Sequence, residues 1–135
     1  MTKCLNANCR VCPYVKVGKE VICSVTGEKY VINSQCYCHT TGCVYCLSCV
    51  KPGCGEQYIG QSGREMRTRW GEHLDYIRDN VRSTGTHFNL PGHNLSHVSF
   101  TVLETVYTNS RLYREARERY YIDLFQTKYR GMNTQ

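Results

Sequence analysis

The sequence has few large apolar side chains and no long apolar run. Its 135 residues include one tryptophan and three phenylalanines, and no segment approaches the roughly 20 apolar residues that a transmembrane helix needs. Met1-Thr2-Lys3 leads directly to Cys4, without the apolar stretch of a secretory signal peptide. We therefore expect no contact with a membrane and an intracellular, reducing location. Residues 1–40 are especially poor in large apolar side chains and need more than hydrophobic burial to fold.

Acidic residues are fewer than basic residues. The chain has 17 Lys and Arg against 11 Asp and Glu, a formal net charge of +6. This balance favours a polyanionic partner. Nucleic acid fits better than a lipid surface, because no basic amphipathic helix with a broad apolar face is present.

Cysteine is abundant instead, with ten cysteines and five histidines. An even number of cysteines is compatible with a secreted, disulfide-bonded binding domain. Several cysteines and histidines lie at spacings typical of metal ligands, and no signal peptide is visible. The pattern therefore favours bound metal over disulfides.

The hydrophobic pattern predicts an α+β fold. Residues 20–24 and 29–32 suggest a small hairpin, whereas 43–49 and 57–60 read as two antiparallel strands joined by a glycine-containing turn. A helix follows to about Asn80, opened by a capping box of Ser62 and Glu65. Its apolar residues recur at helical spacing: Met66, Trp70, Leu74 and Ile77.

The second half supplies one strand and one helix. Residues 83–97 show no period, 98–104 alternate as a strand, and a helix is predicted from Ser110 to about Lys128. Its expected inner face consists of Leu112, Ala116, Tyr120, Tyr121 and Leu124. The order predicts a small antiparallel three-stranded sheet flanked by helices. We expect a Cys-rich, zinc-stabilised N-terminal extension over 1–40 and one domain over 41–135.

Five residues form a plausible phosphodiesterase site. Arg69 and His73, four residues apart, project from one face of the first helix. Tyr45 and Tyr58 lie on the two paired strands, and Glu118 shares a face of the last helix with apolar residues. Such a carboxylate is costly unless it binds a cation. Together the set offers a phosphate ligand, proton-transfer groups and a hard oxygen ligand for Mg²⁺. Glu115 is an alternative inward-facing acid.

These residues resemble the GIY-YIG endonucleases. The second element of the family motif is intact as Tyr58-Ile59-Gly60, and the first keeps only its tyrosine, in Cys43-Val44-Tyr45. The family's arginine falls on Arg69, with Arg67 a weaker match. Its metal-binding glutamate falls on Glu118, and its late asparagine, which the resemblance adds to the catalytic residues, falls on Asn133. The resemblance covers residues 43–135.

The resemblance implies hydrolysis of DNA with one divalent metal ion. Glu118 would hold Mg²⁺ or Mn²⁺, and Arg69 would stabilise the charge of the transition state. Tyr45 would act as general base, directly or through His73, and Tyr58 would position phosphate or water. The base is the weakest of these roles, since a neutral tyrosine with a pKa of about 10 is a poor base at pH 7.

A narrower resemblance is to the endonuclease domain of Penelope-like retroelements. It rests on Cys49 and Cys54 between the two tyrosine elements and on the segment from His87 to His93. It implies nicking of target DNA to expose a 3′-OH for priming. It also implies fusion to a reverse transcriptase, association with its RNA and a nuclear location.

Two zinc sites are predicted. Cys49, Cys54, His87 and His93 form a workable Cys₂His₂ structural site, with His97 as a spare ligand. A second, less complete cluster consists of Cys4, Cys9 and Cys12, for which Cys36 is the preferred fourth ligand. The rival fourth ligands are Cys38, Cys23 and His39. Cys43 and Cys46 are expected to be buried free thiols.

Two classes of function remain beside the endonuclease. One is a catalytically inactive, zinc-stabilised nucleic-acid-binding module that has kept the fold. The other is the disulfide-bonded secreted domain. Retention of both tyrosines, the arginine, the histidine and the glutamate in order favours the enzyme.

Overall fold

A three-stranded antiparallel sheet forms the centre of the protein. The computed structural model describes residues 1–32, 34–108 and 110–133. Strands β3 (Cys43–Cys49), β4 (Gln57–Ser62) and β5 (Val98–Thr105) are arranged in the order β4-β3-β5. β3 is paired on both sides, and six of its seven residues are buried. The predicted antiparallel sheet is confirmed.

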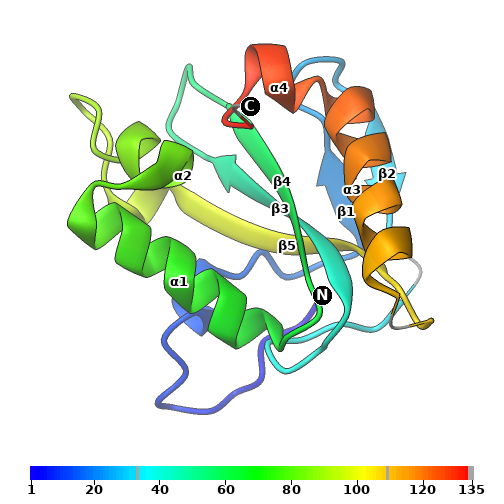
Figure 1. Ribbon diagram of the computed structural model, residues 1–135. Helices are drawn as coiled ribbons and strands as arrows, with labels where there is room; N and C mark the ends of the chain where they lie inside the picture. The colour runs from blue at the N-terminus through cyan, green and yellow to red at the C-terminus, as the bar shows by residue number, and fades with distance from the viewer. Residues whose placement is uncertain (33, 109, 134–135) are drawn as a thin grey trace.

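The helices flank this sheet on two sides. Figure 1 shows α1 (Met66–Asp79) and α2 (Arg82–His87) on one side of β4, and α3 (Arg111–Phe125) and α4 (Thr127–Arg130) on the other. A sheet flanked by helices confirms the α+β class predicted from the sequence. No helix among the described residues is both long enough and apolar enough to cross a bilayer.

Helix α1 is held to the sheet by its apolar stripe. Trp70 stacks on Phe100 of β5, with ring centroids 4.9 Å apart and an interplanar angle of 3°. All four predicted stripe residues are buried. The predicted capping box is wrong, because Ser62 belongs to β4 and Glu65 is itself the N-cap, with no side-chain cap bond. Backbone carbonyls bind the free N–H groups instead: Met66 donates to Thr40 (3.0 Å) and Arg67 to Cys38 (2.6 Å).

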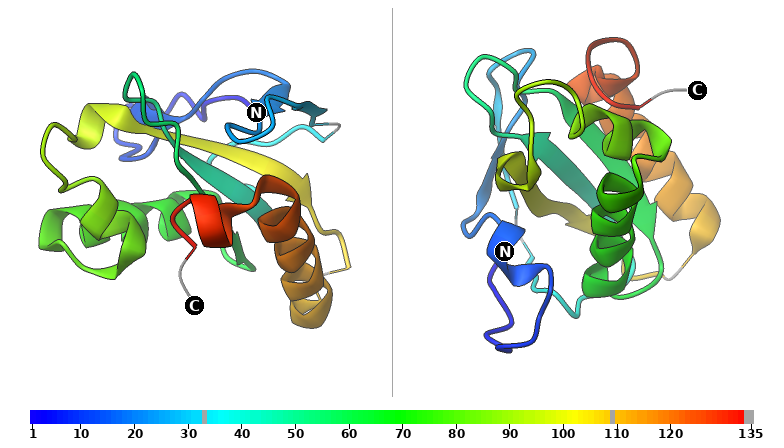
Figure 2. Two further views of the ribbon diagram at one scale, coloured as in Figure 1. Left: turned by 90° about the horizontal axis from the view of Figure 1, so that it is seen from above. Right: turned by 90° about the vertical axis from the view of Figure 1, so that its left-hand side faces the viewer.

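The residues that precede the central sheet cover the free edge of β5 and the face of the sheet opposite α1 and α2. The hairpin of β1 (Glu20–Ile22) and β2 (Lys29–Val31) forms as predicted. Val15, just after the short 3₁₀ helix η1 (Cys12–Tyr14), forms a bridge with Phe100 and so protects the free edge of β5. Figure 2 shows this N-terminal part on the opposite face of the sheet from α1 and α2. The buried residues of both parts belong to one continuous hydrophobic core.

Helix α3 presents only part of the predicted inner face to the core, through Tyr121 and Leu124. Leu112, Ala116 and Tyr120 are exposed, whereas Arg114 and Phe125 are buried. Polar contacts explain this choice, since Arg114 donates to Gln61 of β4 at 3.0 Å. The helix also ends earlier than predicted, at Phe125, because Gln126 adopts a left-handed conformation and α4 follows.

Two short helices occupy the segment for which the sequence shows no period. α2 (Arg82–His87) follows α1 closely and packs against it. The 3₁₀ helix η2 (Leu95–His97) leads into β5 and begins with a capping box, in which the Asn94 side chain accepts from Ser96 N and Asn94 N donates to His97. Helices this short carry too few turns to show a hydrophobic period.

Candidate active site and metal centres

A polar cleft of about 570 Å³ lies between α1, α2, α3 and the end of the chain. Four of the predicted catalytic residues and Asn133 line it. The described residues that form its wall are Tyr58, Arg69, His73, Tyr76, Arg82, Ser83, Thr84, Glu118, Ile122 and Asn133. The fold therefore gathers residues that are 75 positions apart in the sequence, from Tyr58 to Asn133.

Tyr45 lies beneath the cleft and forms hydrogen bonds with two of its residues, His73 and Arg69. Its hydroxyl lies 2.8 Å from His73 Nε2 and accepts a hydrogen bond from Arg69 Nε at 3.0 Å. Arg69 also donates to Glu72 at 3.0 Å and to Tyr76 at 3.2 Å. These bonds fix the guanidinium in a direction set by three neighbours, so it is pre-organised to receive an anion.

Burial keeps His73 neutral. Desolvation, with a further contribution from Arg69, lowers the pKa of His73 to about 3. In a neutral imidazole one ring nitrogen donates and the other accepts. Nδ1 lies 2.9 Å from the hydroxyl of Thr84, and Nε2 faces Tyr45. His73 therefore links a threonine on α2 to the tyrosine at the centre of the sheet.

The two tyrosines differ in their access to the cleft. Tyr45 is 0% exposed, and desolvation followed by the neighbouring Tyr58 raises its pKa above the ordinary value. Desolvation also raises the pKa of Tyr58, although Tyr58 lines the cleft. Both phenols are therefore protonated at pH 7. In this arrangement Tyr58 is the tyrosine that meets a bound molecule, and Tyr45 orients Arg69 and His73.

Gly60 allows the tyrosine of the neighbouring strand to lie across the sheet. Tyr45 and Gly60 are partners in the β3–β4 pairing. A Cβ added at Gly60 would collide with the phenol ring and hydroxyl of Tyr45. The glycine of Tyr58-Ile59-Gly60 is therefore required by packing at this site.

Glu118 is a half-buried carboxylate without a basic partner. Within the described part of the chain no Lys, Arg or His forms an ion pair with it, and desolvation followed by Glu115 raises its pKa. The charge of Arg69 and, to a smaller extent, the backbone N–H of Gln61 lower the pKa in part. An acid placed in this way fits a divalent cation, because a cation offsets both the burial and the neighbouring negative charge.

Asn133 contacts the backbone of β4. Its amide donates to Ile59 O at 2.8 Å and accepts from Ile59 N at 2.7 Å, and the side chain is buried. This two-bond contact attaches the end of the chain to the strand that carries Tyr58 and closes one side of the cleft. The structure thus gives Asn133 a positioning role, and its predicted catalytic role remains a prediction.

The alternatives to Arg69 and Glu118 lie elsewhere. Arg67 pairs with Glu65 at 3.1 Å on the exposed side of α1. Glu115 pairs with Arg111 at 2.8 Å, one helical turn away. Neither contributes to the wall of the cleft as described, so the geometry favours the first choice in each case.

The predicted Cys₂His₂ set converges in space. The ligand atoms of Cys49, Cys54, His87 and His93 all lie within 4.8 Å of one another. Cys54 Sγ is 3.5 Å from His87 Nε2, and His93 Nε2 is buried without a hydrogen-bond partner in the described structure. A buried nitrogen with a free lone pair suits a metal ligand. His97 Nδ1 instead accepts a bond from Asn94 N at 3.1 Å.

Glu56 supports this set from outside. Its Oε2 lies 3.6 Å from His87 Nδ1, the nitrogen turned away from Cys54. Carboxylates in this position orient metal-binding histidines and strengthen them as ligands. The four residues and Glu56 therefore fit zinc.

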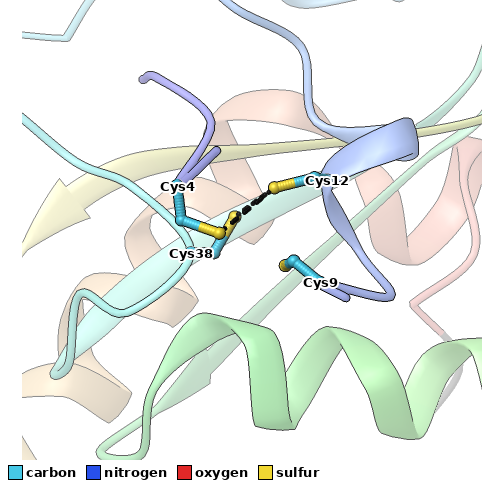
Figure 3. Close-up of side chains that lie close together, drawn as sticks. All are labelled: Cys4, Cys9, Cys12 and Cys38. Atoms are coloured by element: carbon cyan, nitrogen blue, oxygen red, sulfur yellow. Dashed lines mark hydrogen bonds between the residues drawn. The ribbon is translucent and has the colours of Figure 1, made fainter. Parts of the chain in front are cut away.

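The N-terminal cysteines also converge, with one correction. Cys4, Cys9 and Cys12 meet Cys38, and the ligand atoms of these four lie within 4.8 Å of one another. Figure 3 shows the four side chains turned toward one another. The preferred fourth ligand, Cys36, is wrong: its sulfur contacts Ser34 and Thr105 at 3.4 Å. The chain turns back toward η1 after Cys36, so Cys38 is the cysteine that reaches the cluster.

The other rivals for the fourth position are engaged elsewhere. Cys23 faces the carbonyl of Phe125, and His39 Nδ1 lies 2.9 Å from Glu65. Cys43 and Cys46 are buried free thiols in β3, as predicted, and burial raises the pKa of each to about 12.

Comparison with known proteins identifies the family. A family model described as the GIY-YIG catalytic domain matches residues 41–133. The chain belongs to the GIY-YIG family. No curated protein sequence matches it. Among solved structures it is similar to the catalytic domain of the homing endonuclease I-TevI, with 18% identity and a TM-score of 0.57 over 68% of this chain and 96% of that chain. At this identity the likeness shows the fold.

Membership of the GIY-YIG family supports a nuclease that acts on DNA and uses a divalent metal. Among the cleft residues that were not predicted, Tyr76 bonds to Arg69 and Thr84 bonds to His73. Tyr76 lies three residues after His73 and seven after Arg69, so helical spacing alone could have added it. Thr84 has no sequence signal, because it reaches His73 only through the packing of α2 on α1.

Proposed function

We propose that the protein is a divalent-metal-dependent DNA endonuclease that acts in the cleft between α1 and α3. The observation that carries this proposal is the placement of Glu118, a half-buried carboxylate without a basic partner in the described structure, in one wall with Arg69 and Tyr58. An anion-binding group and a cation-binding group in the same cleft suit a phosphodiester accompanied by a metal ion.

Glu118 would hold Mg²⁺ or Mn²⁺, which when bound supplies Lewis-acid stabilisation of charge on the phosphate. Arg69 binds a phosphate oxygen with the guanidinium fixed by Tyr45, Glu72 and Tyr76. Its charge is most valuable when the phosphate carries extra negative charge in the transition state.

Tyr58 and His73 have separate roles toward the attacking water, one in positioning it and the other in holding or passing on a proton. Tyr58 presents a protonated hydroxyl in the cleft, where it positions a phosphate oxygen or the water. His73 stays neutral and joins Tyr45 to Thr84, a chain along which a proton is held or passed on. Tyr45 as general base is a proposal that requires its pKa to fall below the raised value set by burial.

The DNA backbone is expected to follow the basic surface around the cleft. Arg82 lies at the cleft wall, and its guanidinium sits 5.8 Å from the ring centroid of Tyr76. Lys128 and Arg119 lie on the far side of Glu118. Such contacts position DNA without reading its sequence, so binding should weaken as salt increases.

Glu118→Gln tests the proposal with Glu115→Gln as a matched control. We expect Glu118→Gln to lower the rate of plasmid nicking in Mg²⁺ by roughly 100-fold or more, since a metal ligand supplies several kcal/mol to the transition state. Glu115→Gln, three residues earlier and paired with Arg111, should cut at close to the wild-type rate. Nicking by Glu118→Gln at the wild-type rate would remove the metal role. No nicking by the wild-type chain, with DNA still bound, would favour the inactive binding module.

The biological setting is proposed on the cysteine and histidine pattern. Cys49, Cys54, His87 and His93 resemble the corresponding residues of Penelope-like retroelement endonucleases, and their convergence in space supports that reading. We propose that the domain nicks target DNA in the nucleus and exposes a 3′-OH for a reverse transcriptase. That enzyme, with its RNA, would belong to the same full-length protein.

The chemistry of the nick tests this setting. A nick that leaves a 3′-OH and a 5′-phosphate can be extended directly by a polymerase, and we expect radiolabelled nucleotides to be incorporated at the nick without prior phosphatase treatment. A 3′-phosphate product, which no polymerase extends, would contradict the priming role and leave the nuclease proposal intact.

A further inference from the structure

Four cysteines from two separate segments meet beside the first turn of α1. The Sγ atoms of Cys4 and Cys12 are 3.3 Å apart, as are those of Cys12 and Cys38, and all four sulfurs lie within 4.8 Å of one another. A tetrahedral zinc with Zn–S bonds of about 2.3 Å has sulfur–sulfur edges of about 3.8 Å. Two observed separations are about 0.5 Å shorter than this value and the others are at most 4.8 Å, so a metal ion could bind with small movements of the sulfurs. A disulfide would bring one pair to about 2.05 Å and separate it from the others.

The four cysteines are also partly or fully buried. Cys38 is 0% exposed, and Cys4, Cys9 and Cys12 are partly buried and pack against the hydrophobic core. Such a site holds the four sulfurs together and limits the access of water to them, which suits a structural metal.

We propose that Cys4, Cys9, Cys12 and Cys38 bind one Zn²⁺ as a tetrathiolate centre, separate from the Cys₂His₂ site. Binding converts the thiols to thiolates, and their protons are released to solvent. The site is independent of the nuclease proposal, because it lies outside the cleft and its presence is measured by metal content.

The centre would fasten the N-terminal segment to the helix that carries Arg69 and His73. Cys38 provides a thiolate and also the carbonyl that accepts from Arg67 N, in the first turn of α1. Arg10, between Cys9 and Cys12, forms an ion pair with Asp75 of α1 at 2.6 Å. Zinc would therefore fix both contacts through one ion and give residues 1–40 the stability that their small apolar content does not supply.

Cys38→Ser and Cys36→Ser form a matched pair for the test. Both residues are buried cysteines of the same loop, but among the described residues the sulfur of Cys36 forms hydrogen bonds with Ser34 and Thr105 and lies outside the four-cysteine group. We expect Cys38→Ser, purified in parallel with the wild-type chain, to contain one zinc ion fewer per chain by elemental analysis. Cys36→Ser should keep the wild-type content. Equal zinc in the wild-type chain and Cys38→Ser, or the loss of an ion in Cys36→Ser, would overturn the assignment.

A second measurement needs no variant of the cluster. Cobalt bound by four thiolates absorbs at lower energy and has stronger sulfur charge-transfer bands than cobalt bound by two thiolates and two imidazoles. We expect Co²⁺ added to the metal-free wild-type chain to give both spectra, and Cys54→Ser to keep only the tetrathiolate one. A wild-type spectrum with Cys₂His₂ character alone would overturn the proposal even if Cys38→Ser fails to fold.

Discussion

At the scale of single residues, the hydroxyl of Thr84 determines how His73 is held. Thr84 Oγ1 lies 2.9 Å from His73 Nδ1, and both side chains are buried. Because the neutral ring carries one N–H proton, the bond at Nδ1 and the bond between Nε2 and Tyr45 depend on each other. Thr84 is therefore a positioning residue that acts through His73.

Thr84→Val removes this bond and keeps the shape of the side chain. We expect the kcat for nicking to fall about tenfold, the equivalent of roughly 1.4 kcal/mol for one buried hydrogen bond, with little change in KM. Thr84→Ser restores the hydroxyl and should recover most of the rate. Equal kcat for the valine and serine variants would show that Thr84 only fills space.

At the scale of elements, the pairing of β3 with β4 depends on a missing side chain. The ring of Tyr45 lies over its partner Gly60, where a Cβ would overlap it. At Gly71, in the middle of α1, the one described atom within 4 Å of an added Cβ is a distal nitrogen of Arg10, at 3.9 Å. The same substitution should therefore have opposite effects at the two positions.

We expect Gly60→Ala to lower the free energy of unfolding by roughly 1–3 kcal/mol, the usual cost of overpacking. Gly71→Ala should raise it by roughly 0.5–1 kcal/mol, since alanine is the better helix former. Urea denaturation followed by circular dichroism measures both. A stable Gly60→Ala protein would mean that the Tyr45 ring moves aside at low cost.

The element predictions that failed share a physical cause. The capping box was expected at Ser62 and Glu65, but the first N–H groups of α1 bond to carbonyls of Cys38 and Thr40, more than 20 residues earlier. A local pattern has no access to such partners. On α3 the predicted inner residues Tyr121 and Leu124 do pack against the core, but Leu112, Ala116 and Tyr120 are exposed. Arg114 and Glu118 face inward instead, since this part of the helix forms a polar contact with β4 and a wall of the cleft.

At the scale of the whole molecule, α2 carries residues of both the predicted Cys₂His₂ site and the candidate active site. Thr84 contacts His73, and His87, the last residue of the same helix, belongs to the zinc set with Cys54 on the β3–β4 turn. Metal at this set would hold α2 against the hairpin that carries both tyrosines. Its loss should loosen α2 and the loop that follows it.

His93→Ala and His97→Ala test this coupling. His93→Ala should lose one zinc ion and show faster amide hydrogen exchange over residues 82–97. His97→Ala, which removes a helix-capping contact, should keep its zinc and alter exchange only near η2. Equal exchange over α2 in the two variants would contradict the coupling.

The sequence by itself determined the kind of protein. Alternation and helical spacing predict the three strands and the stripe of α1, since each depends on neighbours within a few residues. The ordered set of Tyr45, Tyr58, Arg69 and Glu118 carries the family, which the match over residues 41–133 confirms. The Cys₂His₂ set could be predicted from the sequence because its ligands form two close pairs along the chain and few other residues are candidate ligands.

Only the tertiary structure decided which side chains meet. The sequence favours Cys36 over its rival Cys38, but the turn of the chain after Cys36 places Cys38 against Cys4, Cys9 and Cys12. Thr84 becomes part of the active site through the packing of α2 on α1. Tyr45, first in the family motif, is buried beneath the cleft that Tyr58 lines. Direction and burial arise from contacts between distant segments, and spacing along the chain carries no record of them.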